Sequence, residues 1–200
     1  MAPKILDFMD ERVLVIDGAM GTLIQQADLT LDDFGGQENC SEILLETRPD
    51  FVHEVHEAYL KAGASAVETN TFGANKIVLA EFGLEARTHE LNVLGARLAR
   101  EVCDAFSTAE EPRFVLGSMG PGTKLPTLGH TDFDTLVDSY AEQVRGLLDG
   151  GADALLIETC QDILQVKAAV AACRTAFRDR GRTLPIFCQV TIESIGKMLV

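Results

Sequence analysis

The chain has 200 residues, of which 46% are hydrophobic, and it carries a formal net charge of −14 at pH 7. This length suits one domain and is too short for two of ordinary size. The composition excludes a chain that is disordered throughout, and no apolar run approaches the roughly 20 residues that a membrane-spanning helix needs. The negative charge argues against binding to nucleic acid or to an anionic membrane, because phosphate groups would be repelled.

The first residues, MAPKILDFMDE, contain no long apolar stretch and no cleavage site of small residues, so we expect no signal peptide. The cysteines are spread along the chain without a Cys-x-x-Cys motif, a pattern typical of a reducing compartment. We therefore expect a soluble, cytoplasmic protein. Its cysteines are expected to be small buried apolar residues, except for one at a strand end: the buried set is Cys40, Cys103, Cys173 and Cys188, and the exception is Cys160.

Short runs of β-branched and large apolar residues alternate with stretches of helical periodicity. The runs are nearly continuous, which indicates strands buried on both faces, as in a parallel sheet. In chain order, the predicted elements are strand 13–16, helix 49–61, strand 66–67, helix 90–106, strand 114–116, helix 132–149, strand 154–157, helix 162–177 and strand 186–190. Such alternation predicts βαβ units.

The segments AGASAVET (62–69) and GGADALLIET (150–159) form a weak internal echo. The second copy is two residues longer, which keeps Glu68 and Glu158 on the same face of a strand whose period is two residues. Pro49 suits the first turn of a helix, and Gly63 and Gly151 suit helix ends. The internal echo and the positions of these proline and glycine residues support repeated β/α units.

A closed parallel barrel has eight strands and about 250 residues or more. With five predicted strands, we expect an α/β fold of the (β/α)8 TIM-barrel type that is truncated after about five β/α units. Residues 1–200 would then be the incomplete N-terminal portion of the barrel. An unclosed barrel leaves unpaired backbone groups at both sheet edges, which favours self-association.

Polar residues and glycines follow each predicted strand. The clusters are Asp17-Gly18-Ala19, Glu68-Thr69-Asn70-Thr71, Gly117-Ser118, Glu158-Thr159-Cys160, and Gln189 with Thr191 and Glu193. In parallel α/β folds the carboxyl ends of the strands carry the ligand site. Converging carboxylates can hold an ammonium group, and glycines let backbone N–H groups approach a carboxylate. The set predicts a site for an α-amino acid.

Each of these residues also has a purely structural interpretation. Asp17 could belong to a turn, the two glutamates could pair with arginines or backbone amides, and Asn70 and Ser118 could cap loops. The histidines are expected to be structural or solvent-facing, because no third metal ligand accompanies the closest pair; they are His53, His56, His89 and His130.

Four motifs together resemble the homocysteine S-methyltransferase family: DGAMGT (17–22), ETNTF (68–72), GSMGP (117–121) and ETCQD (158–162). The stretches LPTLGHTDFD (125–134) and LLIETCQDILQVKAA (155–169) look most like the N-terminal, homocysteine-binding domain of its cobalamin-dependent, methionine-forming members. The resemblance covers nearly the whole chain and implies a (β/α)8 barrel.

The resemblance also implies the site. Asp17 and Glu158 would hold the amino group of homocysteine, and Gly18, Ala19 and Ser118 would lie against its carboxylate or backbone. The wall formed by the second strand would consist of Glu68, Asn70 and Thr71.

In that family, zinc held by three cysteines activates the homocysteine thiol, one cysteine after the sixth strand and an adjacent pair after the eighth. The thiolate takes a methyl group from methylcobalamin, which a folate-binding module recharges from methyltetrahydrofolate. This chain has no adjacent Cys-Cys pair, so we expect it alone to bind neither zinc nor cobalamin and to be inactive. Ile195 and Lys197 stand where smaller polar residues are common, which puts the fine contacts of that loop in question.

Two alternatives remain open from the sequence. One is a stand-alone homocysteine methyltransferase that uses S-methylmethionine or a related sulfonium as donor. The other is an inactive fragment whose open sheet edges pair with another copy.

Overall fold

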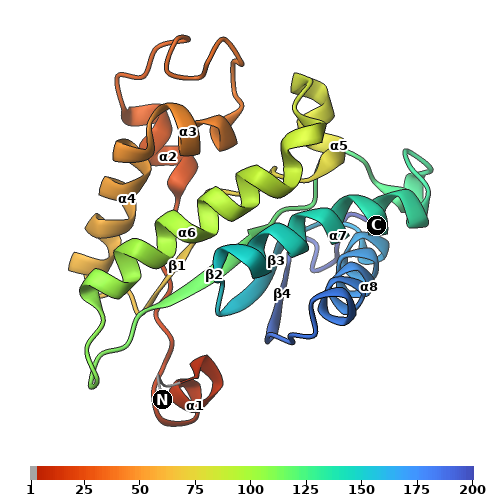
Figure 1. Cartoon of the computed structure of the whole chain (residues 1–200). Coiled ribbons are helices and arrows are strands. Elements are labelled where there is room, and N and C mark those ends of the chain that lie inside the picture. Colours follow the sequence, from red (N-terminus) through yellow and green to blue (C-terminus); the bar gives the residue numbers. More distant parts are fainter. Residues whose placement is uncertain (1–3) are drawn as a thin grey trace.

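The computed structural model describes residues 4–200, so the first three residues of the segment expected to lack a signal peptide lie outside it. A parallel sheet in the order β1-β2-β3-β4 forms its centre. The strands are Ala66–Glu68, Phe114–Met119, Ala154–Cys160 and Ile186–Val190. Strands and helices alternate along the chain, as the sequence predicts for repeated β/α units (Figure 1).

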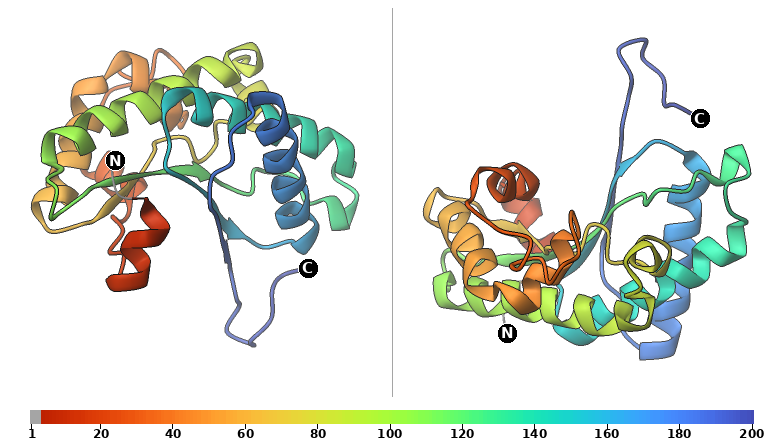
Figure 2. Two further views of the ribbon diagram at one scale, coloured as in Figure 1. Left: turned by 60° about the horizontal axis from the view of Figure 1, so that its bottom comes forward. Right: turned by 90° about the horizontal axis from the view of Figure 1, so that it is seen from above.

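The long helices pack against one face of this sheet (Figure 2). They are α4 (Pro49–Lys61), α6 (Thr88–Phe106), α7 (Phe133–Gly150) and α8 (Ile163–Arg180), and all four expected helices are confirmed to within a few residues. Asp132 and Asp162 stand just outside α7 and α8 as N-caps, and each side chain accepts a backbone N–H of the first turn.

Shorter helices connect these elements and were not expected from the sequence. They are α1 (Ile5–Glu11), α2 (Met20–Gln26), α3 (Leu44–Thr47) and α5 (Lys76–Leu79), with 3-10 turns η1 (Ser41–Ile43), η2 (Ala80–Phe82), η3 (Glu85–Arg87) and η4 (Pro126–Leu128). They are too short to show a helical period in the sequence.

The prediction of a strand at 13–16 is wrong. Within the described residues, this segment contributes one isolated parallel bridge between Ile16 and Ala66. The Val15 carbonyl accepts the N–H groups of Ser65 and Ala66, and the Asp17 N–H donates to the Ala66 carbonyl. Because β1 has only three residues, its outer edge is too short for a longer ladder. The bridge nevertheless sets Asp17 beside the end of β1.

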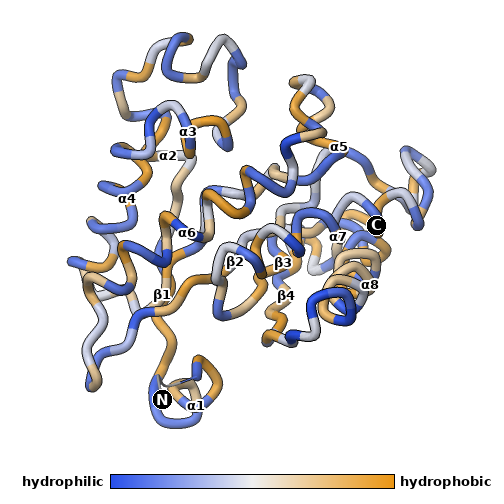
Figure 3. Tube along the Cα trace, viewed as in Figure 1, coloured by the Kyte–Doolittle hydropathy of each residue, from blue (hydrophilic) through white to orange (hydrophobic). Residues whose placement is uncertain are grey.

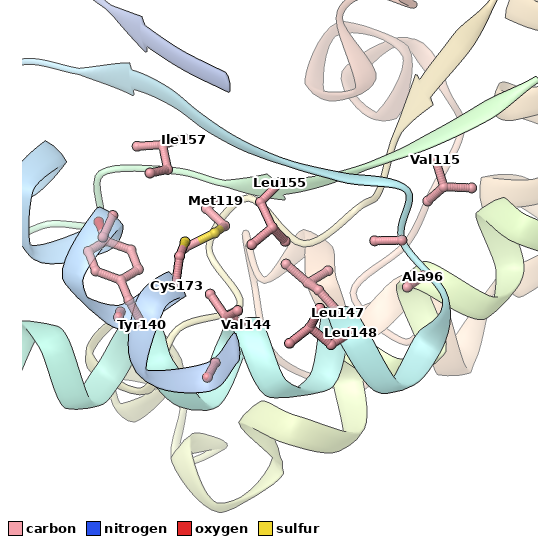
Figure 4. Packing of buried hydrophobic residues seen from close by; sticks show 14 of the residues in the cluster. Ala96, Val115, Met119, Tyr140, Val144, Leu147, Leu148, Leu155, Ile157 and Cys173 are labelled. Atoms are coloured by element: carbon pink, nitrogen blue, oxygen red, sulfur yellow. The ribbon is translucent and has the colours of Figure 1, made fainter. Parts of the chain in front are cut away.

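Side chains of the strands alternate between two hydrophobic clusters, as the strand period requires. On the helix side, Leu155 lies beside Leu147 of α7, and Ile157 belongs to the same cluster (Figure 4). On the other side, Leu116 and Leu156 pack with residues of α1. Hydrophobic and hydrophilic residues alternate along α6 and α7 (Figure 3), and their apolar faces are the buried ones.

Four cysteines are buried, but Cys188 is exposed, so the expectation that it is a buried apolar residue is wrong. It lies in β4, which pairs only with β3 among the described strands, and β4 becomes more exposed towards its end. The segment after β4 extends away from the helices (Figure 2). In residues 4–200, no helix is both long and apolar enough to cross a bilayer.

Candidate functional site

A pocket of about 400 Å³ lies at the carboxyl end of the sheet. Glu68, Ser118 and Glu158 line it. Each is two residues beyond a strand residue of the cluster that packs on α1, so the alternation of the strands turns all three away from the long helices. Both glutamates therefore share one face, as the internal echo predicts.

Seven of the eight predicted site residues line this pocket: Asp17, Gly18, Ala19, Glu68, Asn70, Ser118 and Glu158. In particular, Asp17 and Glu158 reach the same pocket, although they lie far apart in the sequence. The eighth residue, Thr71, is fully buried behind the wall. Gln189, Thr191 and Glu193, which follow the last strand, are not part of the lining.

Asp17 is anchored on the end of β1. Its two carboxylate oxygens lie 3.0 and 3.1 Å from the backbone nitrogen of Glu68, which donates to them. Burial raises the pKa of Asp17 to about 7, against the lowering effect of these N–H bonds. Its carboxyl group is therefore part-protonated at neutral pH.

Glu68 of β1 and Glu158 of β3 lie on strands separated by β2, and their charges influence each other across the pocket. Burial, followed by the charges of Glu158 and Asp17, raises the pKa of Glu68 to about 8. Burial also raises the pKa of Glu158, while the Ser118 hydroxyl, which donates to its carboxylate at 2.5 Å, acts in the opposite direction. Two of the three acids thus raise the pKa of a third.

The strand that carries Glu158 is irregular at this point. The register between β3 and β4 shifts between Ile157 and Cys160, and Thr159 has a φ of 59°, in the left-handed region that non-glycine residues rarely adopt. Such bulges re-aim side chains beside active sites. Here the distortion falls at the residue next to Glu158.

Among residues 4–200, the lining contains three carboxyl groups and no lysine, arginine or histidine. Buried carboxylates without a cation are costly, and they respond by holding protons. A ligand that carries a positive charge would offset this cost and favour the ionised acids. The pocket can therefore bind an ammonium group.

A network of hydroxyl groups stands behind the pocket wall. The Thr71 hydroxyl donates to the Ser118 carbonyl at 2.9 Å and lies 2.6 Å from the Thr69 hydroxyl. Asn70 also fastens the wall, because its amide donates to the Ser41 carbonyl at 2.8 Å. Asn70 therefore both holds the loop that carries Ser41 and lines the pocket.

Sequence reasoning missed part of the lining: Met20, Gly21, Ile24, Ser41, Thr69 and Phe72. The motifs DGAMGT and ETNTF contain four of these residues, and that signal could have found them. Phe72 lies over Gly120, where an added Cβ would come within 2.7 Å of its ring. Ser41 has no local signal, since only the folded loop brings it to the pocket.

A larger hollow elsewhere lacks comparable chemistry. A groove of about 950 Å³ runs along α8 and is lined by apolar residues with Lys167, Arg174 and Arg178, but by no acid, cysteine or histidine. It offers no converging groups of the kind that define a small-molecule site.

The residues of the pocket do not fit a thiolate-held zinc ion. In the part of the chain that the structure describes, no three His, Cys, Asp or Glu side chains are grouped to hold a metal. The lining has no cysteine. Cys160 ends the same strand as Glu158, but burial raises the pKa of its thiol to about 12, far from the thiolate that zinc requires.

Comparison with known proteins identifies the family of the chain. A profile described as homocysteine S-methyltransferase matches residues 14–200. The chain belongs to the homocysteine S-methyltransferase family. It is 54% identical over 196 residues to a methionine synthase of Mycobacterium tuberculosis and 53% identical over 196 residues to that of Mycobacterium leprae. Each match covers 98% of this chain and 16% of the relative.

Solved structures of the family share the fold. The oxidized form of the Escherichia coli homocysteine methyltransferase MmuM superimposes with a TM-score of 0.75 at 24% identity, over 96% of this chain and 66% of that one. The metallated form gives a TM-score of 0.69 at 26% identity, over 90% and 64%. The barrel-type α/β fold is thus confirmed as a partial barrel.

Proposed function

We propose that the pocket binds homocysteine, and that the chain is the homocysteine-binding part of a methyltransferase that forms methionine. One observation carries the proposal: three carboxyl groups from separate elements converge on one pocket that has no basic residue in its lining. An α-ammonium group is the partner that this charge pattern selects, and membership of the family supplies the substrate class.

In this proposal, Asp17 and Glu158 hold the ammonium group, and Glu68 adds to the negative field. The ligand carboxylate or backbone lies against Gly18, Ala19 and Ser118. The hydrogen bonds of residues 4–200 do not use the N–H groups of Gly18 and Ala19, which supports their availability to a ligand. Asn70 shapes the wall, and Thr71 acts from behind it.

The methyl donor is proposed to be methylcobalamin, recharged from 5-methyltetrahydrofolate on modules outside this chain. The identity to two methionine synthases, of which the match covers 16%, supports this donor. We propose further that residues 1–200 are the first part of a barrel and that the zinc ligands lie outside them. This part alone would then have no turnover. We also propose that the protein is cytoplasmic. A sulfonium donor is the alternative.

Self-association is a second proposed property of the chain. β4 is a sheet edge in the described structure, and exposed apolar side chains gather in and after it: Val190, Ile192, Ile195 and Leu199. An open edge with apolar neighbours is a template for pairing with another copy.

Isothermal titration of homocysteine tests the binding proposal. Glu158→Gln keeps the shape of the side chain and removes its charge, so we expect binding about tenfold weaker, the size of one charged hydrogen bond. Glu101→Gln is the matched control, because Glu101 is exposed on α6, away from the pocket. 4-Mercaptobutyrate, which lacks the amino group, is expected to bind neither protein. The ammonium site would be refuted if wild type bound 4-mercaptobutyrate as tightly as homocysteine. It would equally be refuted if wild type and Glu158→Gln bound homocysteine with the same affinity.

A further inference from the structure

Ser118 lies in the part of β2 that extends beyond the end of the neighbouring strand β1. β1 ends at Glu68, which is in register with Leu116, while β2 continues to Met119. The Ser118 N–H and carbonyl face the side where β1 has ended. Left unpaired in this buried position, both groups would be costly.

Two threonine hydroxyls take the place of the missing strand. The Ser118 N–H donates to the Thr69 hydroxyl at 3.0 Å, and the Thr71 hydroxyl donates to the Ser118 carbonyl at 2.9 Å. Because the Thr71 proton is used on the carbonyl, the 2.6 Å contact between the two hydroxyls has Thr69 as its donor. The hydrogen bonds therefore run in one direction, from the N–H of Ser118 through the two hydroxyls to the carbonyl of the same residue. We call this set of bonds the threonine clamp.

The surroundings of Thr71 leave it no access to a ligand. Its side chain is fully buried, and its methyl group would lie 2.6 Å from a Cβ added at Gly95, so α6 approaches it closely only because that residue is glycine. Gln143 of α7 donates from Nε2 to the Thr71 carbonyl at 2.8 Å and to the Ser118 carbonyl at 3.3 Å. The clamp is thus held on two helices.

Of the clamp residues, Thr69 and Ser118 line the pocket, and Ser118 connects the clamp to Glu158. The Ser118 hydroxyl donates to Oε1 of Glu158 at 2.5 Å, a short bond to a charged acceptor and hence a strong one. No basic residue lines the pocket. The charge of Glu158 raises the pKa values of two acids and a thiol around it, namely Asp17, Glu68 and Cys160.

We infer that Thr71 is a positioning residue: through the threonine clamp it fixes Ser118, and Ser118 in turn holds the Glu158 carboxylate ready for the cation in the pocket. The identity of that cation rests on the proposed function, but the geometry of the clamp does not. Thr71 thus acts from behind the wall of the pocket and is not part of its lining.

Titration of the Glu158 carboxyl by carbon-detected NMR tests the inference without any ligand. Thr71→Val removes the hydroxyl at constant volume, so we expect Ser118 to lose its fixed position and the pKa of Glu158 to rise, by up to about one pH unit if the charge-assisted bond from Ser118 is lost altogether. Thr71→Ser keeps the hydroxyl and should restore the wild-type titration. Thr88→Val is the matched control, since Thr88 is equally buried and its hydroxyl donates to the Glu85 carbonyl. Glu158→Gln assigns the signal.

An unchanged Glu158 titration in Thr71→Val, or a failure of Thr71→Ser to restore it, overturns the inference. If Thr71→Val does not fold, Gln143→Met replaces it, and it should shift the titration in the same direction; no shift overturns the inference equally. Homocysteine titration at pH 7 then separates the two proposals, with up to about tenfold weaker binding expected for Thr71→Val. A shifted pKa in a protein whose wild type does not bind homocysteine supports the clamp and refutes the proposed function.

Discussion

Substitution of Glu68 measures how much the buried acids of the pocket lower the folding stability of the protein. Its pKa is raised from an ordinary value of 4.5 to about 8, first by burial and then by the charges of Glu158 and Asp17. A carboxyl whose pKa is higher in the folded state binds more protons there than in the unfolded chain. Its favourable contribution is complete below pH 4.5 and is lost as the pH rises through about 8.

The size of the effect follows from that interval. At about 1.4 kcal/mol for each pH unit, the interval from 4.5 to about 8 corresponds to about 5 kcal/mol of lost stability at high pH. Glu68 is only partly buried, and water and the coupling to the other acids reduce this figure. We expect Glu68→Gln, which imitates the protonated acid, to be nearly as stable as wild type at pH 5 and about 2 kcal/mol more stable at pH 9.

Urea unfolding followed by circular dichroism at pH 5 and pH 9 measures this difference. Glu101→Gln, with an exposed side chain, is expected to follow wild type at both values. A Glu68→Gln protein that is less stable than wild type at pH 9, or whose advantage does not grow with pH, would show that Glu68 has a cation partner or is well solvated. The reasoning on the whole acidic pocket would then fail.

Two further predictions concern other parts of the fold. His56 is fully buried, and neither of its ring nitrogens has a hydrogen-bond partner among residues 4–200. Burial lowers its pKa to about 4, so the folded protein loses about 3 kcal/mol of stability as the pH falls from 6.5 to 4. His56→Phe should abolish that part of the acid sensitivity in urea unfolding, and His130→Gln, at an exposed site, should retain it; identical pH profiles for the two variants would contradict the prediction. On the edge strand, Val190→Lys should keep the chain monomeric at concentrations where wild type associates. Light scattering with size-exclusion chromatography measures this, and a monomeric wild type across the range would exclude the association.

Much of the site could be inferred before any coordinates, because each piece is local. Asp17, Glu68, Ser118 and Glu158 each follow an apolar run, and the carboxyl ends of parallel strands meet at one end of a sheet. The motifs that contain these residues also indicated the family that the profile match shows. What the motifs do not contain, such as Ser41, is brought to the pocket by a loop whose path depends on long-range hydrogen bonds like the one from Asn70.

The errors have physical causes of the same kind. The run at 13–16 has the composition of a strand, but pairing needs a partner edge, and β1 provides only three residues. Cys188 stands in an apolar run that predicts a buried strand. It is exposed because β4 lies at the edge of the described sheet.

The sequence by itself determined the alternation of strands and helices, the helix caps, and which polar residues gather at one end, because periodicity and capping act over a few residues. Only the tertiary structure decided which of these residues touch the pocket. Thr71 belongs to the same motif as Glu68, but the end of β1 turns its hydroxyl onto the Ser118 carbonyl instead of a ligand. The raised pKa values of Asp17 and Glu68 are likewise tertiary, since they arise from burial and from charges on strands distant in the chain.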